Sequence, residues 1–186
     1  MAGKDKIQAY VLSVARRGGR FVQLHDGGVP PAVARNLATV PRDEGLSMHW
    51  VSGMKFEQCH EDRACCEHLG GDGGRRSQLL GFEAADQRLL DPMRKGYQAR
   101  GLPAMLRNLR EAGISVEMLW FIGFSTRTRP DVVAAARWLL DHRAGFGMTA
   151  FVGDYFLHPG TEVFERQAEK FCEGRAAIRP GSGSER

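Results

Sequence analysis

Hydrophobic positions follow two spacings along this chain. Some stretches repeat an apolar residue every three or four positions, as in a helix with one buried face. Others are short apolar runs typical of buried strands. The first stretch predicts a helix over residues 4–17, which ends at a glycine pair. The apolar runs predict five strands, over residues 20–25, 46–52, 77–83, 114–122 and 147–156. Helical patterns lie between successive strands, so the elements alternate.

This alternation predicts a parallel sheet with helical crossovers. No glycine-rich phosphate-binding turn follows the first strand, which argues against a dinucleotide-binding sheet. We therefore expect an α/β fold, a partial (β/α) TIM-type barrel with about five parallel strands and outer helices. In such barrels the functional groups lie at the C-terminal ends of the strands. Here those ends carry titratable residues at His25-Asp26, Glu83 and His158.

Composition and charge narrow the class of protein. The 186 residues are 42% hydrophobic and 26% charged, which fits one globular domain over 1–172, followed by a flexible Gly/Ser-rich tail over 173–186. Without a long apolar run or a signal core, a cytoplasmic protein with no membrane contact is expected. The net charge of +4 comes from scattered basic residues, and no aromatic platform alternates with them. Specific nucleic-acid binding is therefore not expected.

Four segments carry a family resemblance in the expected order: FVQLHDGGVPP, GFEAADQRLLDPMRKGY, LREAGISVEMLWFIGF and YFLHPGTEVFE. Together they resemble the barrel of radical S-adenosylmethionine (SAM) enzymes, in the branch often found with a cobalamin-binding domain. The resemblance implies a domain that binds SAM beside a [4Fe–4S] cluster and generates a 5′-deoxyadenosyl radical. It also implies a small-molecule or peptide substrate and leaves room for cobalamin in a separate domain. It names no catalytic residue.

The resemblance assigns cofactor-binding roles to seven positions. Glu83 matches the residue that contacts cofactor or substrate, although it could also complement the dipole of the following helix. Lys95 matches a base that pairs with the methionine carboxylate, with a solvated surface lysine as the alternative. Asp26 lies near the loop that grips the methionine amine. The remaining positions are expected to face the adenine: Phe121, Ile122, Gly123 and Phe156.

The cluster motif of the family, C-x3-C-x2-C, does not occur in this sequence. The resemblance begins at the first helix, so we expect the first barrel strand and the cluster loop upstream of Met1. The cysteines at 59, 65 and 66 have another spacing and fall in a predicted helix, which favours buried thiols over metal ligands. The alternative is a metal site built from Cys59, His60, Cys65, Cys66 and His68.

Two functions from different classes remain. The chain is either the C-terminal part of a radical SAM barrel or a non-catalytic truncated remnant or interaction module with the same fold. Arg127 stands where the family has an acid that caps the next helix, which weakens the expected grip on the cofactor. The DNA upstream of Met1 separates the two, since it either encodes the three-cysteine motif or does not. Either way, the strand at 20–25 is expected at an open sheet edge.

Overall fold

The structure is a computed structural model that describes residues 4–25, 28–71, 73–124, 127–156, 158–162 and 164–165. The chain separates into two compact units, Met1–Gly153 and Asp154–Arg186. The sheet and its helices belong to the first unit, and the account of the fold concerns that unit. The boundary predicted at residue 172 and the predicted tail at 173–186 lie outside the described residues.

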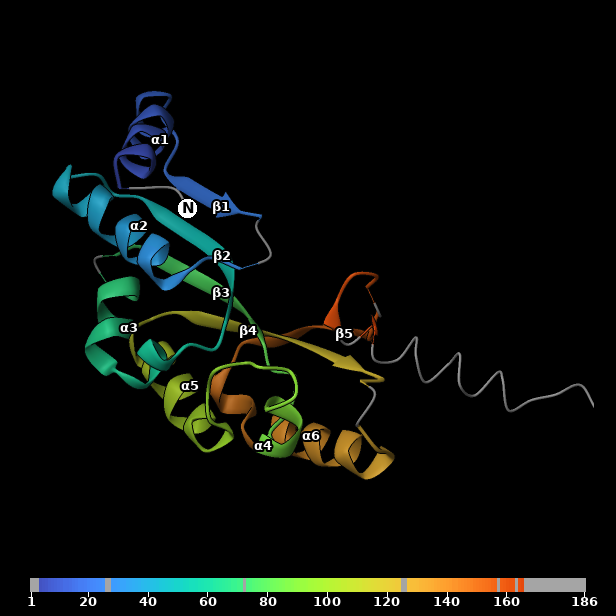
Figure 1. Cartoon of the computed structure of the whole chain (residues 1–186). Helices are drawn as coiled ribbons and strands as arrows, with labels where there is room; N and C mark the ends of the chain where they lie inside the picture. The colour runs from blue at the N-terminus through green and yellow to red at the C-terminus, as the bar shows by residue number, and fades with distance from the viewer. Residues whose placement is uncertain are drawn as a thin grey trace, which may run out of the picture. The chain divides into compact units, whose positions relative to one another are not determined.

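A single five-stranded sheet organises the first unit. Its strands are β1 (Phe21–Leu24), β2 (His49–Lys55), β3 (Arg75–Gly81), β4 (Ser115–Ile122) and β5 (Met148–Asp154), and they lie side by side in chain order (Figure 1). The pairings of β1 with β2, β2 with β3 and β3 with β4 are all parallel. The five parallel strands curl into a half-barrel, which confirms the predicted partial TIM-type barrel.

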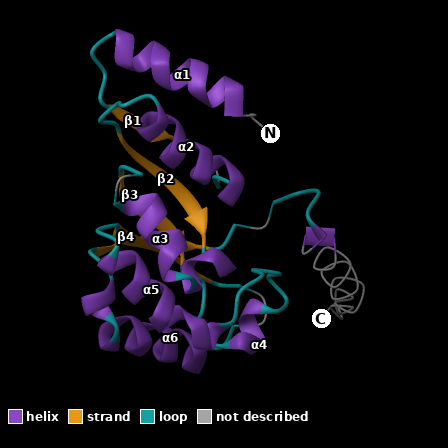
Figure 2. Ribbon diagram, turned by 90° about the vertical axis from the view of Figure 1, so that its left-hand side faces the viewer, coloured by secondary structure: helices purple, strands orange, loops and turns teal. Residues whose placement is uncertain are grey.

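Helices connect the strands and cover one side of the sheet (Figure 2). They are α1 (Lys4–Arg16), α2 (Pro31–Asp43), α3 (Arg63–Gly70), α4 (Gln87–Leu90), α5 (Leu102–Glu111) and α6 (Arg129–Asp141). Three short 3₁₀ turns complete the connections: η1 (Gln58–Glu61), η2 (Ala99–Gly101) and η3 (Arg143–Gly145). Successive parallel connections have the same hand, so they place their helices on the same face. Within the described residues, no helix is both long enough and apolar enough to cross a membrane.

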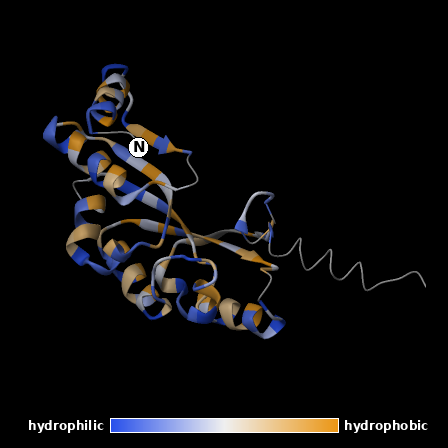
Figure 3. Cartoon of the chain, in the orientation of Figure 1, coloured by the Kyte–Doolittle hydropathy of each residue, from blue (hydrophilic) through white to orange (hydrophobic). Residues whose placement is uncertain are grey.

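Side-chain alternation along the strands separates the core from the open face of the sheet. On β4, Val116, Met118 and Trp120 are buried against the helices. The intervening Glu117 and Leu119 are only half-buried, because alternate side chains point to the opposite, concave face. Figure 3 shows that the strands carry a mixture of polar and apolar residues. Full burial of each large apolar side chain contributes about 1.5–3 kcal/mol, so the helix-covered face supplies most of the stability.

Strand boundaries differ from the prediction by up to three residues. The strand predicted over 46–52 is β2, which starts at His49 because the residues before it complete the end of α2; Leu46 N donates to Pro41 O at 2.7 Å. The strand predicted over 77–83 is β3, which ends at Gly81, and Glu83 leaves the sheet with a left-handed backbone. β1 lies at an edge of the sheet, as expected for the strand at 20–25.

Candidate functional site

An ion pair lies just beyond the C-terminal end of β3. Glu83 follows this strand by two residues, and Lys95 lies in the loop after α4. Lys95 Nζ donates to Glu83 Oε1 at 2.7 Å. The side chains are only 9% and 24% exposed, so water screens the pair less than it screens a surface salt bridge. The two side chains that the resemblance assigned to cofactor binding therefore contact each other.

The two oxygens of this carboxylate have different surroundings. Glu83 Oε1 accepts a hydrogen bond from Lys95 Nζ, whereas Oε2 is buried and has no hydrogen-bond partner among the described residues. Leaving a buried polar atom unpaired costs about 1–3 kcal/mol, and more for a charged group. A donor on a bound molecule would remove that cost. The arrangement is therefore suited to receive an ammonium or hydroxyl group.

The backbone of Glu83 is held in an unusual conformation. Its φ of 55° lies in the left-handed region, which costs a non-glycine residue about 1–2 kcal/mol. The Trp120 indole N–H donates to the Glu83 carbonyl at 3.1 Å, and the Arg127 guanidinium donates to the same oxygen. Strain held in place by neighbouring groups is frequent at functional sites. Glu83 therefore has both the position and the local conformation of a binding residue.

Gly81 makes room for the carboxylate. A Cβ atom on this residue would lie 2.5 Å from Glu83 Oε1, so any larger residue would displace the acid. On the other side, the Tyr97 hydroxyl donates to Phe82 O at 3.0 Å and holds the segment before Glu83. Burial, with a smaller contribution from Glu83, raises the pKa of Tyr97, so its hydroxyl stays a neutral donor. Lys95 therefore holds the carboxylate of Glu83, Gly81 leaves room for it, and Tyr97 holds the backbone just before it.

Arg127 is a third charged group at this edge. Besides the Glu83 carbonyl, its guanidinium donates to the carbonyl of Phe121, and it lies over the rings of Trp120 and Phe121 at 5.8 and 5.4 Å. Burial lowers the pKa of Arg127, and the Glu83 carboxylate opposes that shift. The site therefore holds two cations and one anion, a balance that favours a ligand with a negative group.

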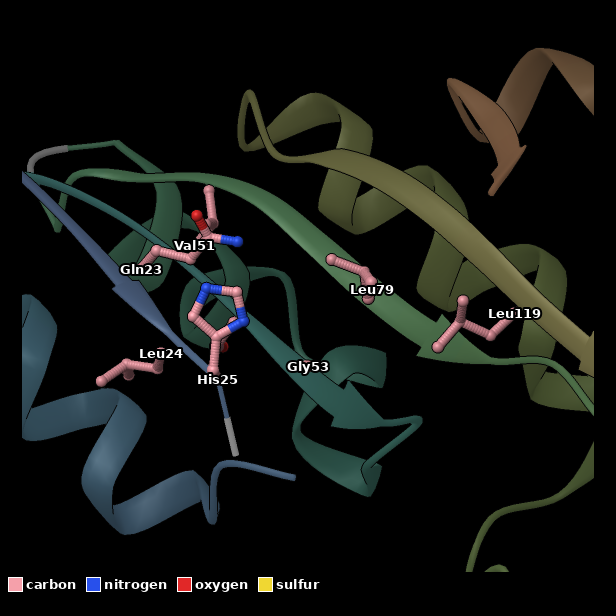
Figure 4. A pocket seen from close by; sticks show the side chains of 8 residues that line it. Gln23, Leu24, His25, Val51, Gly53, Leu79 and Leu119 are labelled. Carbon is pink, nitrogen blue, oxygen red and sulfur yellow. The ribbon is translucent and has the colours of Figure 1, made fainter. Parts of the chain in front are cut away.

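A cavity of about 380 Å³ opens on the concave face of the sheet (Figure 4). Its lining comes from four adjacent strands and the residue after β1: Gln23, Leu24, His25, Val51, Ser52, Gly53, Leu79 and Leu119. The walls are mostly aliphatic, with polar side chains from Gln23 and His25. Leu119 of β4 is the register partner of Gly81, the last residue of β3. This part of the cavity wall therefore adjoins the strand end that precedes Glu83. The concave face thus provides an apolar surface of the size small ligands occupy.

The other assigned positions are distributed differently. Asp26 lies outside the described residues. Phe121 and Ile122 end β4, and Gly123 follows with a φ of 91°. Phe156 belongs to the second unit and is largely exposed there. The structure therefore brings together Glu83, Lys95 and the end of β4, while the cofactor-binding role of all seven positions stays a prediction.

Sequence reasoning missed several residues of this region. Arg127 was noted only as a departure from the family, yet it contacts both strand ends. The cavity residues Val51, Leu79 and Leu119 were also missed. Their signal was the two-residue alternation of the strands, which identifies every second side chain as facing the concave side. Arg127 gave no such signal, because it is 44 residues from Glu83 in sequence.

The side chains of the cysteine-rich segment lie in several environments. Within the described parts of the chain, no three His, Cys, Asp or Glu side chains converge as ligands. The imidazole of His60 is buried beside Gln78, and that of His68 contacts Thr39. Cys59 lies in η1 and not in the predicted helix. The alternative of a metal site in this segment therefore stays a prediction.

Comparisons with known proteins show which solved structures share this fold. No protein-family model and no curated protein matches the chain. Among solved structures, the radical SAM methyltransferase TsrM from Kitasatospora setae, with cobalamin and a [4Fe–4S] cluster bound, superposes with a TM-score of 0.72 at 16% identity. The match covers 98% of this chain and 34% of that one.

Two further matches agree. The cobalamin-dependent SAM radical enzyme OxsB gives a TM-score of 0.59 at 9% identity, covering 93% of this chain and 25% of its own. The radical SAM enzyme HemN from Escherichia coli gives 0.55 at 11%, covering 94% and 47%. The fold is therefore the half-barrel seen in radical SAM enzymes, cobalamin-dependent ones among them, which confirms the resemblance. The chain spans about a third of the length of TsrM.

Proposed function

We propose that this chain is the SAM-binding part of a radical SAM enzyme barrel. The observation that carries the proposal is the Glu83–Lys95 pair at the C-terminal edge of β3, with Glu83 Oε2 buried and unpartnered. SAM has a carboxylate, an ammonium group and ribose hydroxyls, and these complement Lys95 and Glu83 Oε2. The half-barrel fold shared with SAM-binding enzymes adds independent support.

Each residue has a separate role in this proposal. Lys95 would pair with the methionine carboxylate while keeping one hydrogen bond to Glu83. Glu83 Oε2 would accept a hydrogen bond from the ammonium group or a ribose hydroxyl. Adenine would lie against the end of β4. The assignments of Asp26 to the methionine amine and of Phe156 to the cofactor stay predictions. When bound beside a reduced cluster, SAM supplies a 5′-deoxyadenosyl radical for hydrogen abstraction.

The described residues do not fit the [4Fe–4S] cluster. They contain no group of three suitable ligands, and the C-x3-C-x2-C motif is absent from the sequence. We therefore propose that the three thiolates come from a segment outside this sequence. Cobalamin, which TsrM and OxsB bind, would belong to a separate domain here. The substrate would be a small molecule or a peptide.

The second candidate is a non-catalytic remnant or interaction module. Arg127 favours it, because this side chain occupies the Phe121 carbonyl that the adenine would otherwise face. The alternative therefore predicts that SAM does not bind, even when a cluster is supplied.

A cleavage assay separates the two candidates. The 186-residue chain and an extended protein, to which an upstream segment with the C-x3-C-x2-C motif is added, are reconstituted anaerobically with iron and sulfide. Dithionite and SAM are then added, and 5′-deoxyadenosine is quantified. We expect none above the blank from the chain alone and production by the extended protein. Cleavage by the chain alone would overturn the assignment of the cluster to another segment, and an inactive extended protein with an intact cluster would favour the remnant.

Variants test the site itself. Lys95→Met and Glu83→Gln in the extended protein should each lower 5′-deoxyadenosine formation at least tenfold at low SAM concentration. Arg63→Gln is the matched control, because it breaks an ion pair of the same 2.7 Å length on the outer surface of α3. Equal losses in all three variants would show that the Glu83–Lys95 pair has no special role.

A further inference from the structure

Lys55 lies at the edge of the concave cavity, and the SAM site proposed above does not use it. It is the last residue of β2, a strand on which every second residue is buried against the helices. The alternate residues Val51 and Gly53 line the cavity. Lys55 continues this second series, because side chains two positions apart on a strand share a face. Its side chain therefore leaves the strand on the concave side, one step beyond the cavity.

The strand register places this lysine beside the Glu83 carboxylate. Lys55 is the register partner of Gly81, and Gly81 is the partner of Leu119 in the cavity wall. The carboxylate lies over Gly81, since a Cβ atom there would be 2.5 Å from Glu83 Oε1. Lys55 and Leu119 therefore flank the carboxylate from the two neighbouring strands. One row across the sheet thus contains a cation, an anion and an apolar wall.

The ammonium group of Lys55 is available to a ligand. Glu57 Oε1 is 3.7 Å from Lys55 Nζ, which is an ion-pair distance but too long for a hydrogen bond. On another side, Nζ lies 3.9 Å from the position that a Cβ atom on Gly96 would take. Gly96 has no side chain to cover it, and the lysine side chain is 52% exposed. An ammonium on a flexible stem can turn from such a contact toward a bound anion.

The cavity supplies an apolar surface next to this cation. Val51, Leu79 and Leu119 line it from β2, β3 and β4 (Figure 4). Gly53 is the register partner of Leu79 and adds no side chain at the centre of the wall. The volume of about 380 Å³ is near the lower end for small-molecule sites, so the surface suits a compact apolar body.

We propose that this cavity binds the substrate, and that the substrate is an organic acid whose compact apolar body lies in the cavity and whose carboxylate is held by Lys55. The proposal rests on the proposed function, which assigns Lys95 to the carboxylate of SAM and leaves Lys55 for a second anion. Charge complementarity favours an acid over an amine. Lys55, Lys95 and Arg127 bring three positive charges to this edge, against the carboxylates of Glu57 and Glu83.

Calorimetric titration of the 186-residue chain tests the proposal without SAM or a cluster. The probes are octanoate, octylamine and 1-octanol, which share a linear apolar chain and differ in charge. Octanoate should bind about tenfold more tightly than octylamine, because the edge carries more positive than negative charge. Raising the salt concentration from about 0.05 M to about 0.5 M should weaken the binding of octanoate and leave that of octanol nearly unchanged.

Variants locate the two parts of the probe. Lys55→Met should weaken octanoate about fivefold and leave octanol unchanged, whereas Lys55→Arg should keep the affinity for the acid. Leu79→Asn should weaken both probes, because it makes the cavity wall polar. Lys4→Met is the matched control, since Lys4 is 53% exposed and forms an ion pair with Asp43 at 3.4 Å, away from the cavity. It should bind octanoate as the parent protein does.

Several results would overturn the proposal. They are no measurable binding of octanoate, equal binding of octanoate and octylamine, equal effects of Lys55→Met and Lys4→Met, and no effect of Leu79→Asn. Tighter binding of a tri-leucine peptide than of octanoate would overturn the assignment to a small acid.

These failures are distinct from a failure of the proposed function. The titration contains neither SAM nor a cluster, and 5′-deoxyadenosine formation by the extended protein does not require the Lys55 contact. An inactive extended protein that still binds octanoate through Lys55 would contradict the radical SAM function and keep the acid site.

Discussion

The carboxylate of Glu83 lies over Gly81, in space that a side chain at residue 81 would occupy. A Cβ atom there would lie 2.5 Å from Glu83 Oε1, and only the backbone of glycine leaves this room. The same oxygen accepts a hydrogen bond from Lys95 Nζ at 2.7 Å. The absence of a side chain at one position therefore determines where the charge at another is held.

We expect Gly81→Ala to separate binding from stability. The methyl group meets the flexible end of Glu83, so the carboxylate moves and the free energy of unfolding changes by less than about 1 kcal/mol. The displaced acid loses its geometry toward Lys95, and SAM affinity of the extended protein should fall about tenfold. Urea unfolding and equilibrium dialysis measure the two quantities.

Gly101→Ala is the matched control for this substitution. A Cβ atom at residue 101 would likewise meet the end of an acidic side chain, that of Glu61, but outside the candidate site. Its SAM affinity should equal that of the parent protein. An equal loss in both variants would mean that the effect of Gly81→Ala is indirect.

Lys95→Met should destabilise the chain more than Glu83→Gln. Removing the lysine leaves a nearly buried carboxylate without a counter-charge, at a cost of about 1–3 kcal/mol. Removing the charge of the acid leaves a lysine that can turn toward water. Unfolding of both variants and of the double variant gives the coupling energy, expected at about 1 kcal/mol. A coupling near zero would contradict a functional ion pair.

Arg127→Met tests the role of the third charged group. It removes one of the two donors to the Glu83 carbonyl, so the left-handed backbone loses support and stability should fall by about 1 kcal/mol. SAM affinity of the extended protein should fall with it. Tighter binding in this variant would favour the second candidate function, in which the guanidinium blocks the end of β4.

Acid should weaken the fold through His60. Burial lowers the pKa of this imidazole to about 3, against about 6.5 in an unfolded chain, and its Nδ1 accepts from Glu57 N. As the pH falls, His60 is therefore protonated in the unfolded state at a higher pH than in the folded state. Stability should be full above pH 6.5 and decrease toward pH 3, by at most about 1.4 kcal/mol per pH unit.

Chemical unfolding between pH 7 and 5 measures this slope above the range in which most carboxylates titrate. His60→Gln should remove the slope, whereas His49→Gln, which alters an exposed contact with Arg76, should keep it. An unchanged slope in His60→Gln would assign the pH dependence to other groups.

Much of the fold could be predicted from sequence, because buried strands and amphipathic helices leave distinct spacings. The strand over 77–83 was placed two residues too late because hydropathy does not report the left-handed backbone at Glu83. Glu83 and Lys95 were each identified as candidate site residues through the family resemblance, not through residue spacing, and their ion pair was not predicted. Arg127 was missed as a site residue because its contacts depend on how β3 and β4 lie together in space, which no local pattern encodes.

The open curl of the sheet has a consequence for molecular access. In a closed (β/α)₈ barrel, side chains from opposite strands fill the interior in layers, and ligands reach only the rim. Among the described residues, β1 and β5 are the two ends of the sheet, and no strand of that sheet lies opposite the aliphatic wall between them. A long, thin molecule could therefore enter from an edge of the sheet, lie across the aliphatic wall and place one polar end at Glu83. Entry from the side, not through a narrow mouth, would suit a peptide as readily as a compact metabolite.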